Sequence, residues 1–253
     1  MLTAFLEAIR FLTLIPLPFM PPTTGDDYEK TIARSMAWFP AVGLLIGAIG
    51  CVVALVAGAL WNDLARAVAV VVVIGLITSG LHLDGLSDTF DAMMSWRPRE
   101  RKLEIMKDSR IGSMGVLAIV FVLLLKWTSL SAIPAGNIIP LLILSSTASR
   151  ASMSVSLSIF PYARQEGIAL AFMKERKAAD ILIALLMAAA TAWLCMGWHG
   201  LVIAAASLAA GLVFSACCMR EIKGITGDTL GAVSEIGEMV SFLTATAIIA
   251  AIK

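Results

Sequence analysis

Long apolar runs separated by short polar segments make up most of the chain. Runs of about 20 residues can cross a membrane as helices, and they lie at residues 36–60, 64–82, 114–132, 138–160, 179–197, 200–218 and 237–252. Residues 1–14 are too short to cross, and their apolar side chains share one side, which is typical of an interfacial helix. The pattern predicts an all-α polytopic integral membrane protein, a single transmembrane helical domain over residues 1–253 with about seven transmembrane helices, an N-terminal interfacial helix and cytoplasmic helical loops.

Composition agrees with this class and limits the partners. The chain is 59% hydrophobic and only 15% charged, and its mean hydropathy is +0.91. A net charge of +1 provides no basic field for nucleic acid, so the lipid bilayer is the expected surrounding and nucleic acid is not an expected partner. The four cysteines stand in apolar runs without zinc-ligand spacing, as core thiols do. No small-residue cleavage site follows the first apolar segment, so we expect no cleaved signal peptide.

Positive charges indicate how the chain is oriented. With the N-terminus inside, most of the 19 Lys and Arg residues fall on the internal side of the predicted spans. Positive residues remain preferentially in the cytoplasm. We therefore predict a protein of the cell (inner) membrane, with the polar segments at 84–110, 161–178 and 219–228 in the cytoplasm.

Three aspartates follow one another at the end of the second apolar run. On a helix, Asp84, Asp88 and Asp91 fall within an arc of about 60° and form one acidic stripe. Like charges on one face repel one another, and a hard cation held by their oxygens relieves the repulsion. Magnesium typically takes one or two carboxylates plus substrate phosphate oxygens, so we predict an Mg²⁺ site here. The alternative is a solvated acidic helix end with Asp84 as its N-cap.

A second acidic face precedes the last apolar run. Asp228 and Glu235 are seven residues apart and nearly eclipsed on a helix, and the glycines around them favour close packing or ligand approach. Neither acidic group has enough cations of its own nearby. We therefore predict that both groups converge on one cytoplasm-facing magnesium pocket. Glu238 fits equally well as a solvated boundary residue.

Basic residues near these carboxylates suggest anion binding. Lys107–Arg110 is followed by Gly112 and Gly115, which let a ligand approach the backbone while the cations hold phosphate. Arg164, in a cytoplasmic loop, is a weaker candidate for the same role. The segment Arg97–Lys102 instead reads as a juxtamembrane patch against anionic lipid.

Two cations lie inside apolar runs, where an ionisable group usually has a partner. Lys126 is close to a predicted membrane boundary, and we expect its side chain to snorkel there. Arg150 stands in the run Ser145–Ser152, which is too polar to face lipid. We expect Arg150 to point inward, toward a substrate phosphate or a carboxylate, with helix-packing contacts as the alternative.

Taken together, the polar motifs resemble the cobalamin synthase family, the adenosylcobinamide-GDP ribazoletransferases. The resemblance runs from end to end and is strongest in the strings His82-Leu83-Asp84-Gly85-Leu86-Ser87-Asp88 with Asp91, Glu104-Ile105-Met106-Lys107-Asp108-Ser109-Arg110-Ile111-Gly112, Tyr162-Ala163-Arg164, and Thr226-Gly227-Asp228-Thr229-Leu230-Gly231-Ala232 with Glu235. Phe11-Leu12-Thr13 with Pro16, and the stretch from Trp38 to Gly43, also match.

The resemblance implies the last assembly step of the corrinoid nucleotide loop. In that step α-ribazole, or its 5′-phosphate, attacks adenosylcobinamide-GDP, and GMP leaves. The carboxylates would then hold Mg²⁺, and Asp91, or else Asp88, would accept the proton of the attacking hydroxyl. Substrate contacts would come from His82, Lys107, Asp108, Arg110, Arg150, Arg164 and Thr226.

Two other functions remain open at this point. A phosphotransferase of the CDP-alcohol type, making a lipid, would use the same carboxylate chemistry, although its expected arginine after the second aspartate is missing. An ion-coupled transporter would use intramembrane charges, although these carboxylates stand at a membrane edge instead of the midplane. The sequence does not specify the oligomeric state, and it is compatible with a homo-oligomer.

Overall fold

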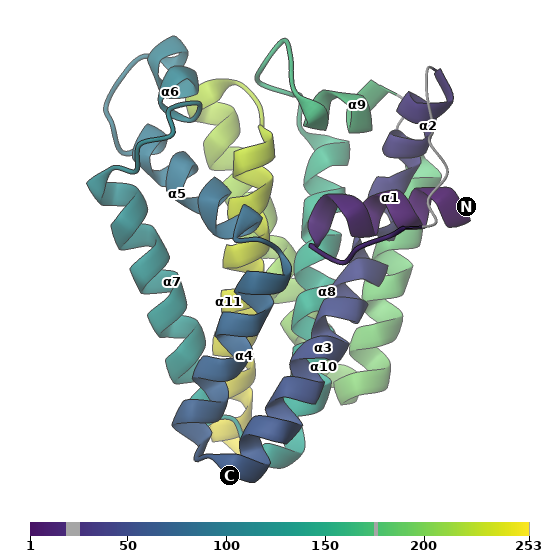
Figure 1. The fold of residues 1–253 in the computed structure, drawn as a ribbon, viewed down its shortest axis with the longest axis vertical. Helices are drawn as coiled ribbons and strands as arrows, with labels where there is room; N and C mark the ends of the chain where they lie inside the picture. The colour runs from purple at the N-terminus through teal and green to yellow at the C-terminus, as the bar shows by residue number, and fades with distance from the viewer. Residues whose placement is uncertain (19–25, 175–176, 253) are drawn as a thin grey trace.

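The computed structural model describes residues 1–18, 26–174 and 177–252, and within them the chain forms helices and one isolated bridge between Tyr162 and Ile225. Figure 1 shows α2, α6 and α9 at one end of a helix bundle and the C-terminus at the other. The elements are α1 (Leu2–Leu12), α2 (Asp26–Ser35), the 3₁₀ turn η1 (Met36–Trp38), α3 (Phe39–Leu60), α4 (Asp63–Ile77), α5 (Leu81–Met93), α6 (Arg99–Ile105), α7 (Ser113–Ala132), α8 (Ala135–Ile159), α9 (Ile168–Lys174), α10 (Ala178–Ile222) and α11 (Gly227–Ile252).

The all-α membrane class is confirmed. Among the described residues, 5 helical segments are long and apolar enough to cross a membrane, and the bent pair α4 and α5 makes up to 6. α10 also contains non-helical backbone at Met196 and Gly197, where the sequence predicts a turn between two spans. A Cβ at Gly200 would lie 2.0 Å from the backbone oxygen of Ala192, so the chain folds closely back on itself there. The count of seven spans stays a prediction.

The predicted end of the second span, 64–82, is wrong. α4 ends at Ile77, and α5 leaves it at an angle of 87°. Ser79 and Gly80 have φ values of 55° and 67°, a left-handed conformation that stops the helix. The bend turns α5, with its aspartates, away from the axis of α4. α11 starts at Gly227, before the predicted span of 237–252, so Asp228 and Glu235 lie on one helix as predicted.

α8 forms the centre of the bundle. A Cβ at Gly43 would lie 2.2 Å from the backbone oxygen of Ser146, and one at Gly47 would lie 2.8 Å from Cα of Ile143, so α3 and α8 touch through their backbones. Every residue of the polar run Ser145–Ser152 is buried. This confirms that the run does not face lipid.

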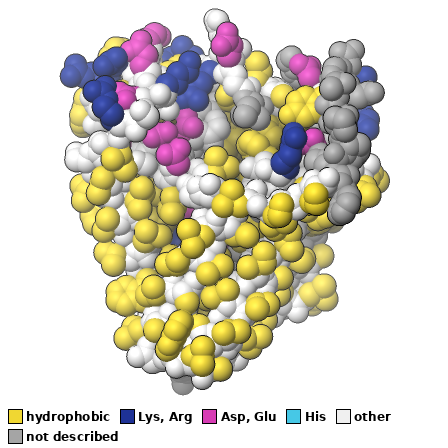
Figure 2. All heavy atoms as spheres, viewed as in Figure 1, with side chains coloured by type: hydrophobic (Ala, Val, Ile, Leu, Met, Phe, Trp, Pro, Cys, Tyr) yellow, Lys and Arg dark blue, Asp and Glu magenta, His cyan; other side chains and the backbone are white. Residues whose placement is uncertain are grey.

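Charged and apolar side chains separate along the bundle. In Figure 2, Lys, Arg, Asp and Glu gather at the end that carries α2, α6 and α9, and hydrophobic side chains cover the face below. Leu55, Phe121 and Leu186 are each more than half exposed on different helices. An apolar surface this extensive is stable in contact with lipid and not with water. In Figure 1, α1 lies across the neighbouring helices, as an interfacial helix does.

Candidate active site

Close contact between α5 and α11 forms the candidate site at the charged end of the bundle. A Cβ at Gly85 would lie 2.5 Å from the backbone oxygen of Asp228, so only glycine lets the two helices meet here. Asp84 and Asp228 line one cavity, and Asp88 interacts electrostatically with both. The structure thus brings together three of the five aspartate and glutamate residues predicted to bind metal.

Arg164 is a cation that lies close to these carboxylates. Arg164 Nη2 donates to Asp228 Oδ2 at 2.7 Å, and its charge opposes the repulsion that Asp88 feels from Asp84, Asp228 and Asp91. The Thr226 hydroxyl donates to the same Asp228 oxygen at 3.3 Å. It also accepts from the Thr229 amide at 3.2 Å, which caps the start of α11. Arg164 and Thr226 therefore set the position of Asp228.

Two cavities meet at Asp84. The larger one, of 650 Å³, is lined by Asp84, Asp88, Lys107 and Asp108, and by Ser87, whose buried hydroxyl has no hydrogen-bond partner among the described residues. The smaller one, of 220 Å³, is lined by Asp84 and Asp228 together with His82, Tyr162 and Arg164. A ligand that fills both cavities would therefore pass over the carboxylates.

Arg110 lies at the margin of the larger cavity. Its side chain is 85% exposed and forms an ion pair with Asp108, in which Arg110 Nη2 donates to Asp108 Oδ2 at 2.5 Å. Hydrogen bonds from the side chain and the backbone amide of Arg110 lower the pKa of Asp108 to about 2. Asp108 is therefore ionised at neutral pH. Lys107 and Asp108 line the cavity wall, and Arg110 does not.

Asp91 holds the start of α7. Its Oδ2 accepts from the Gly112 amide at 2.7 Å, and its Oδ1 accepts from the Gly115 amide at 2.8 Å. A Cβ at Gly112 would lie 2.3 Å from Asp91 Oδ1, so glycine is what lets this backbone reach the carboxylate. Asp91 thus caps α7 from a different helix, and it lines neither of the two cavities among the described residues.

We expect Asp91→Ala to destabilise the folded protein by about 1–2 kcal/mol, because α7 loses its N-terminal acceptor. Asp91→Asn keeps one oxygen and should lose less. Unfolding of both variants in detergent, followed by circular dichroism, measures this difference. An Asp91→Ala protein as stable as the wild type but without activity would show that Asp91 acts chemically and not by holding α7.

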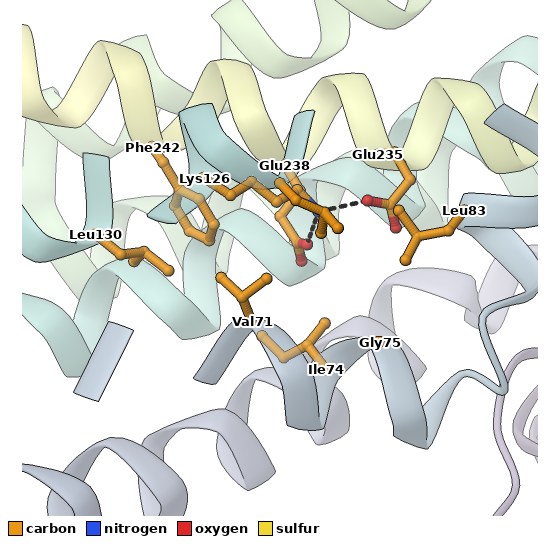
Figure 3. A pocket seen from close by; sticks show the side chains of 10 residues that line it. Val71, Ile74, Gly75, Leu83, Lys126, Leu130, Glu235, Glu238 and Phe242 are labelled. Atoms are coloured by element: carbon orange, nitrogen blue, oxygen red, sulfur yellow. Dashed lines mark hydrogen bonds and ion pairs between the residues drawn. The ribbon is translucent and has the colours of Figure 1, made fainter. Parts of the chain in front are cut away.

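Glu235 lies away from the other predicted metal ligands. Lys126 Nζ donates to Glu235 Oε2 at 2.7 Å and to Glu238 Oε2 at 2.6 Å, and Figure 3 shows this group beside the apolar side chains of Val71, Ile74 and others. Lys126 is 4% exposed. The snorkelling prediction for Lys126 is therefore wrong, and so is the premise that the second acidic face lacks cations.

Arg150 points inward, as predicted, and its partner is a carboxylate. Arg150 Nη1 donates to Glu238 Oε1 at 2.9 Å, and Ser146 donates to the same oxygen at 3.0 Å. Glu238 is consequently a buried member of an ion network and not a solvated boundary residue. Nothing in the local sequence indicated this network, because Lys126, Arg150 and Glu238 come from three different helices.

The network sets the tautomer of His82. Arg150 Nη2 lies 3.3 Å from His82 Nδ1. A guanidinium group has only donors, so Nδ1 accepts, and the proton of the neutral ring is on Nε2. His82 is 1% exposed, and Nε2 has no hydrogen-bond partner among the described residues. Arg164 Nε is unpaired in the same way. Both residues line the 220 Å³ cavity, so a ligand with acceptor atoms there would satisfy two buried donors.

The segment Arg97–Lys102 is not a simple lipid-binding patch. Lys102 is buried and forms an ion pair with Glu221 of α10. Arg99 donates to the backbone oxygens of Ile222 and Ala163, both at 2.8 Å. These bonds attach α6 to α10 and to the loop that carries Arg164.

The donor set fits a hard divalent cation. Asp84 and Asp88 line one cavity and Asp84 and Asp228 line the other, and carboxylate oxygens are the ligands that magnesium prefers. In the part of the chain that the structure describes, no group of three or more His, Cys, Asp or Glu residues is arranged so that it could hold a metal ion by itself. Magnesium commonly completes its coordination with substrate phosphate and water, so this partial set is compatible with it.

Comparison with known proteins identifies the family. A family model described as "Cobalamin-5-phosphate synthase" matches residues 4–246. The chain belongs to this family. Proteins named "Adenosylcobinamide-GDP ribazoletransferase" are similar along almost their whole length. The relative from Roseiflexus sp. (strain RS-1) is 42% identical over 241 residues, which is 95% of this chain and 88% of the relative.

Two further relatives carry the same name. The relative from Herpetosiphon aurantiacus is 37% identical over 96% of this chain and 96% of its own length. The relative from Escherichia coli (strain K12 / DH10B) is 37% identical over 94% of this chain and 97% of its own length. No solved structure gives a significant match. Membership of the cobalamin-5-phosphate synthase family, which the motifs predict, is thereby confirmed.

Proposed function

We propose that this protein transfers the cobinamide phosphate of adenosylcobinamide-GDP to α-ribazole, or to its 5′-phosphate, and releases GMP. The observation that carries the proposal is the meeting of Asp84, Asp88 and Asp228 with Arg164 between two cavities, in a chain of this family. Two substrates that must react need two adjoining spaces, and a pyrophosphate needs cations at their junction.

The reaction is a phosphoryl transfer. The ribazole 3′-hydroxyl oxygen forms a bond to the phosphorus next to the aminopropanol arm. The bond from that phosphorus to the bridging oxygen breaks, and GMP takes the electron pair. Magnesium, when bound, neutralises charge on the pyrophosphate and on the leaving GMP.

Individual residues then have distinct tasks. Asp84, Asp88 and Asp228 would hold the cation, and Arg164, which lines the 220 Å³ cavity beside Asp228, would contact the phosphates. Lys107 and Asp108 line the larger cavity, which takes the guanosine phosphate end. The His82 Nε2–H donates to an acceptor atom of the substrate. Arg150 keeps the proton of the ring on Nε2, because it donates to His82 Nδ1.

The proton of the attacking hydroxyl passes to Asp88 in this scheme. Asp88 lines the larger cavity, and both oxygens of Asp91 already accept backbone amides. Among the described residues, no hydrogen bond or ion pair to Asp88 is found. Asp88 therefore has acceptor sites for a substrate proton, and Asp91 positions the start of α7.

Release of GMP tests the proposal. Purified protein in detergent is mixed with adenosylcobinamide-GDP and α-ribazole, with and without Mg²⁺, and GMP and the corrinoid product are measured by chromatography. We expect GMP only when ribazole and a divalent ion are both present. CMP release from a CDP-linked donor and an alcohol, in place of GMP release, would favour the lipid-making alternative and overturn the proposal.

The proposal also places the active site at the cytoplasmic face, because GDP-linked and ribazole substrates are soluble. In a variant without the four native cysteines, we expect a thiol introduced by Arg97→Cys to react with an impermeant reagent only from the cytoplasmic side. A thiol from Asn62→Cys, at the opposite end of α4, is the matched control and should react from the other side. Labelling of position 97 from the periplasm alone would reverse the orientation.

A further inference from the structure

A third cavity adjoins the candidate active site. It measures 450 Å³ and is lined by residues of α1, α2 and α9 and by Leu81, the first residue of α5. Phe11 and Leu81 line both this cavity and the 220 Å³ cavity that holds Asp84 and Asp228. The two spaces therefore share a wall. Phe11 also belongs to the Phe11-Leu12-Thr13 motif, to which the proposed chemistry assigns no task.

The cavity wall is mainly aromatic and aliphatic. Phe11 and Phe172 pack with ring centroids 5.0 Å apart, and Ile32 and Tyr28 complete the same surface. Aromatic faces of this kind favour a flat, apolar ring system, by stacking and edge-to-face contact.

One edge of the cavity is polar. Arg10 forms an ion pair with Glu7 at 2.7 Å, and Arg10 Nη2 donates to the Tyr28 hydroxyl at 3.2 Å. The guanidinium group also stands 6.0 Å from the centre of the Tyr28 ring. A ligand in this cavity thus meets an apolar surface with a few fixed polar groups, the usual composition of a small-molecule site.

The two substrates contain three ring systems, guanine, corrin and benzimidazole, and these differ in how well they fit a small apolar cavity. Guanine carries polar atoms around its edge and needs matching donors and acceptors, which the larger cavity with Lys107 and Asp108 supplies. The corrin ring bears many amide groups and is larger than both. The base of ribazole is a benzimidazole, two fused rings with almost no polar edge.

We propose that the cavity between α1, α2 and α9 binds the benzimidazole ring of ribazole. The inference rests on the proposed function and adds to it the binding site of the attacking substrate. With the ring against Phe11 and Phe172, the attached ribose extends past Leu81 toward Asp84 and Asp228, where its hydroxyl attacks the phosphoryl group. The wall that this cavity shares with the reaction centre, at Phe11 and Leu81, favours a substrate over lipid as its occupant.

Filling the cavity tests the inference. Ala171 of α9 lines it and is partly exposed, so Ala171→Phe adds bulk to the cavity with little disturbance of the core. We expect the KM for α-ribazole to rise about tenfold or more, while the KM for adenosylcobinamide-GDP stays within about twofold. Leu170→Phe adds bulk to the same helix at a residue that does not line the cavity, and should change neither KM.

A second measurement uses the wild-type protein, so its result does not depend on whether a variant folds. Free 5,6-dimethylbenzimidazole should inhibit the wild type competitively against ribazole and not against adenosylcobinamide-GDP, and Ala171→Phe should weaken that inhibition. Equal rises in both KM values, or an unchanged ribazole KM in a folded Ala171→Phe protein, would overturn the inference. A third result would also overturn the inference: a wild type that is active only with added lipid, together with an Ala171→Phe variant that is active without it. A lipid would then be the occupant of the cavity.

The outcomes separate the two proposals. Wild-type protein that makes no GMP refutes the proposed function. Wild-type protein that makes GMP, with a ribazole KM insensitive to Ala171→Phe, leaves the function intact and refutes only this subsite.

Discussion

Asp88→Asn and Asp84→Asn should each abolish GMP release while the protein remains folded in the membrane. Asparagine has nearly the size of aspartate but no charge, so the cation loses a carboxylate ligand. Replacing an outer-shell partner of a metal ligand typically costs 10–100-fold in affinity or activity, so loss of a direct ligand should exceed about 100-fold. The measurement is the initial rate of GMP formation over a range of Mg²⁺ concentrations.

Glu100→Gln is the matched control for these variants. Glu100 is 74% exposed on α6 at the same end of the bundle, and its ion-pair partner Arg99 is 3.6 Å away. It should retain the wild-type rate. Partial recovery of Asp84→Asn at high Mg²⁺ would support a metal role. Wild-type rates for both aspartate variants at ordinary Mg²⁺ would refute the metal site.

Lys126→Met should strongly destabilise the folded protein. Lys126 neutralises Glu235 and Glu238 inside the bundle, and methionine leaves two buried carboxylates, of which Glu238 keeps its ion pair with Arg150. Removing one member of a buried ion pair typically costs about 3–5 kcal/mol. We expect a correspondingly lower midpoint when the purified protein is unfolded with increasing SDS, followed by circular dichroism.

Lys102→Met provides the matched comparison. Lys102 also forms an ion pair, but its partner Glu221 is half exposed, so water can solvate the carboxylate that remains. The loss of stability should be clearly smaller than for Lys126→Met. Adding Glu235→Gln to Lys126→Met should restore part of the stability, because one unpaired charge is then removed. Equal midpoints for wild type and Lys126→Met would show that the network does not stabilise the fold.

The linear pattern of residues determined the class of protein and much of its chemistry. The length and apolarity of a run, for instance 114–132 against the observed Ser113–Ala132, depend on neighbours in sequence and on the thickness of a bilayer. The position of Asp84, Asp88 and Asp91 on one side of a helix likewise follows from helical geometry alone. The motif strings around them were enough to predict the family.

Only the tertiary structure decided which side chains meet. Asp228 and Glu235 are nearly eclipsed on one helix, yet Asp228 pairs with Arg164 and Glu235 with Lys126. Seven residues along a helix is about 10 Å, far enough to move from the polar end of the bundle to its interior, where different helices supply the partner.

The same reason explains Asp91 and the bend before α5. Asp91 was expected in the metal group, but the backbone of α7, which two glycines bring within 2.8 Å, takes both its oxygens. The left-handed turn at Ser79 and Gly80 gave no apolar or charge signal of its own. Periodicity records which face of a helix is apolar, whereas the partner of a charge depends on contacts between segments far apart in sequence, which one chain's pattern does not specify.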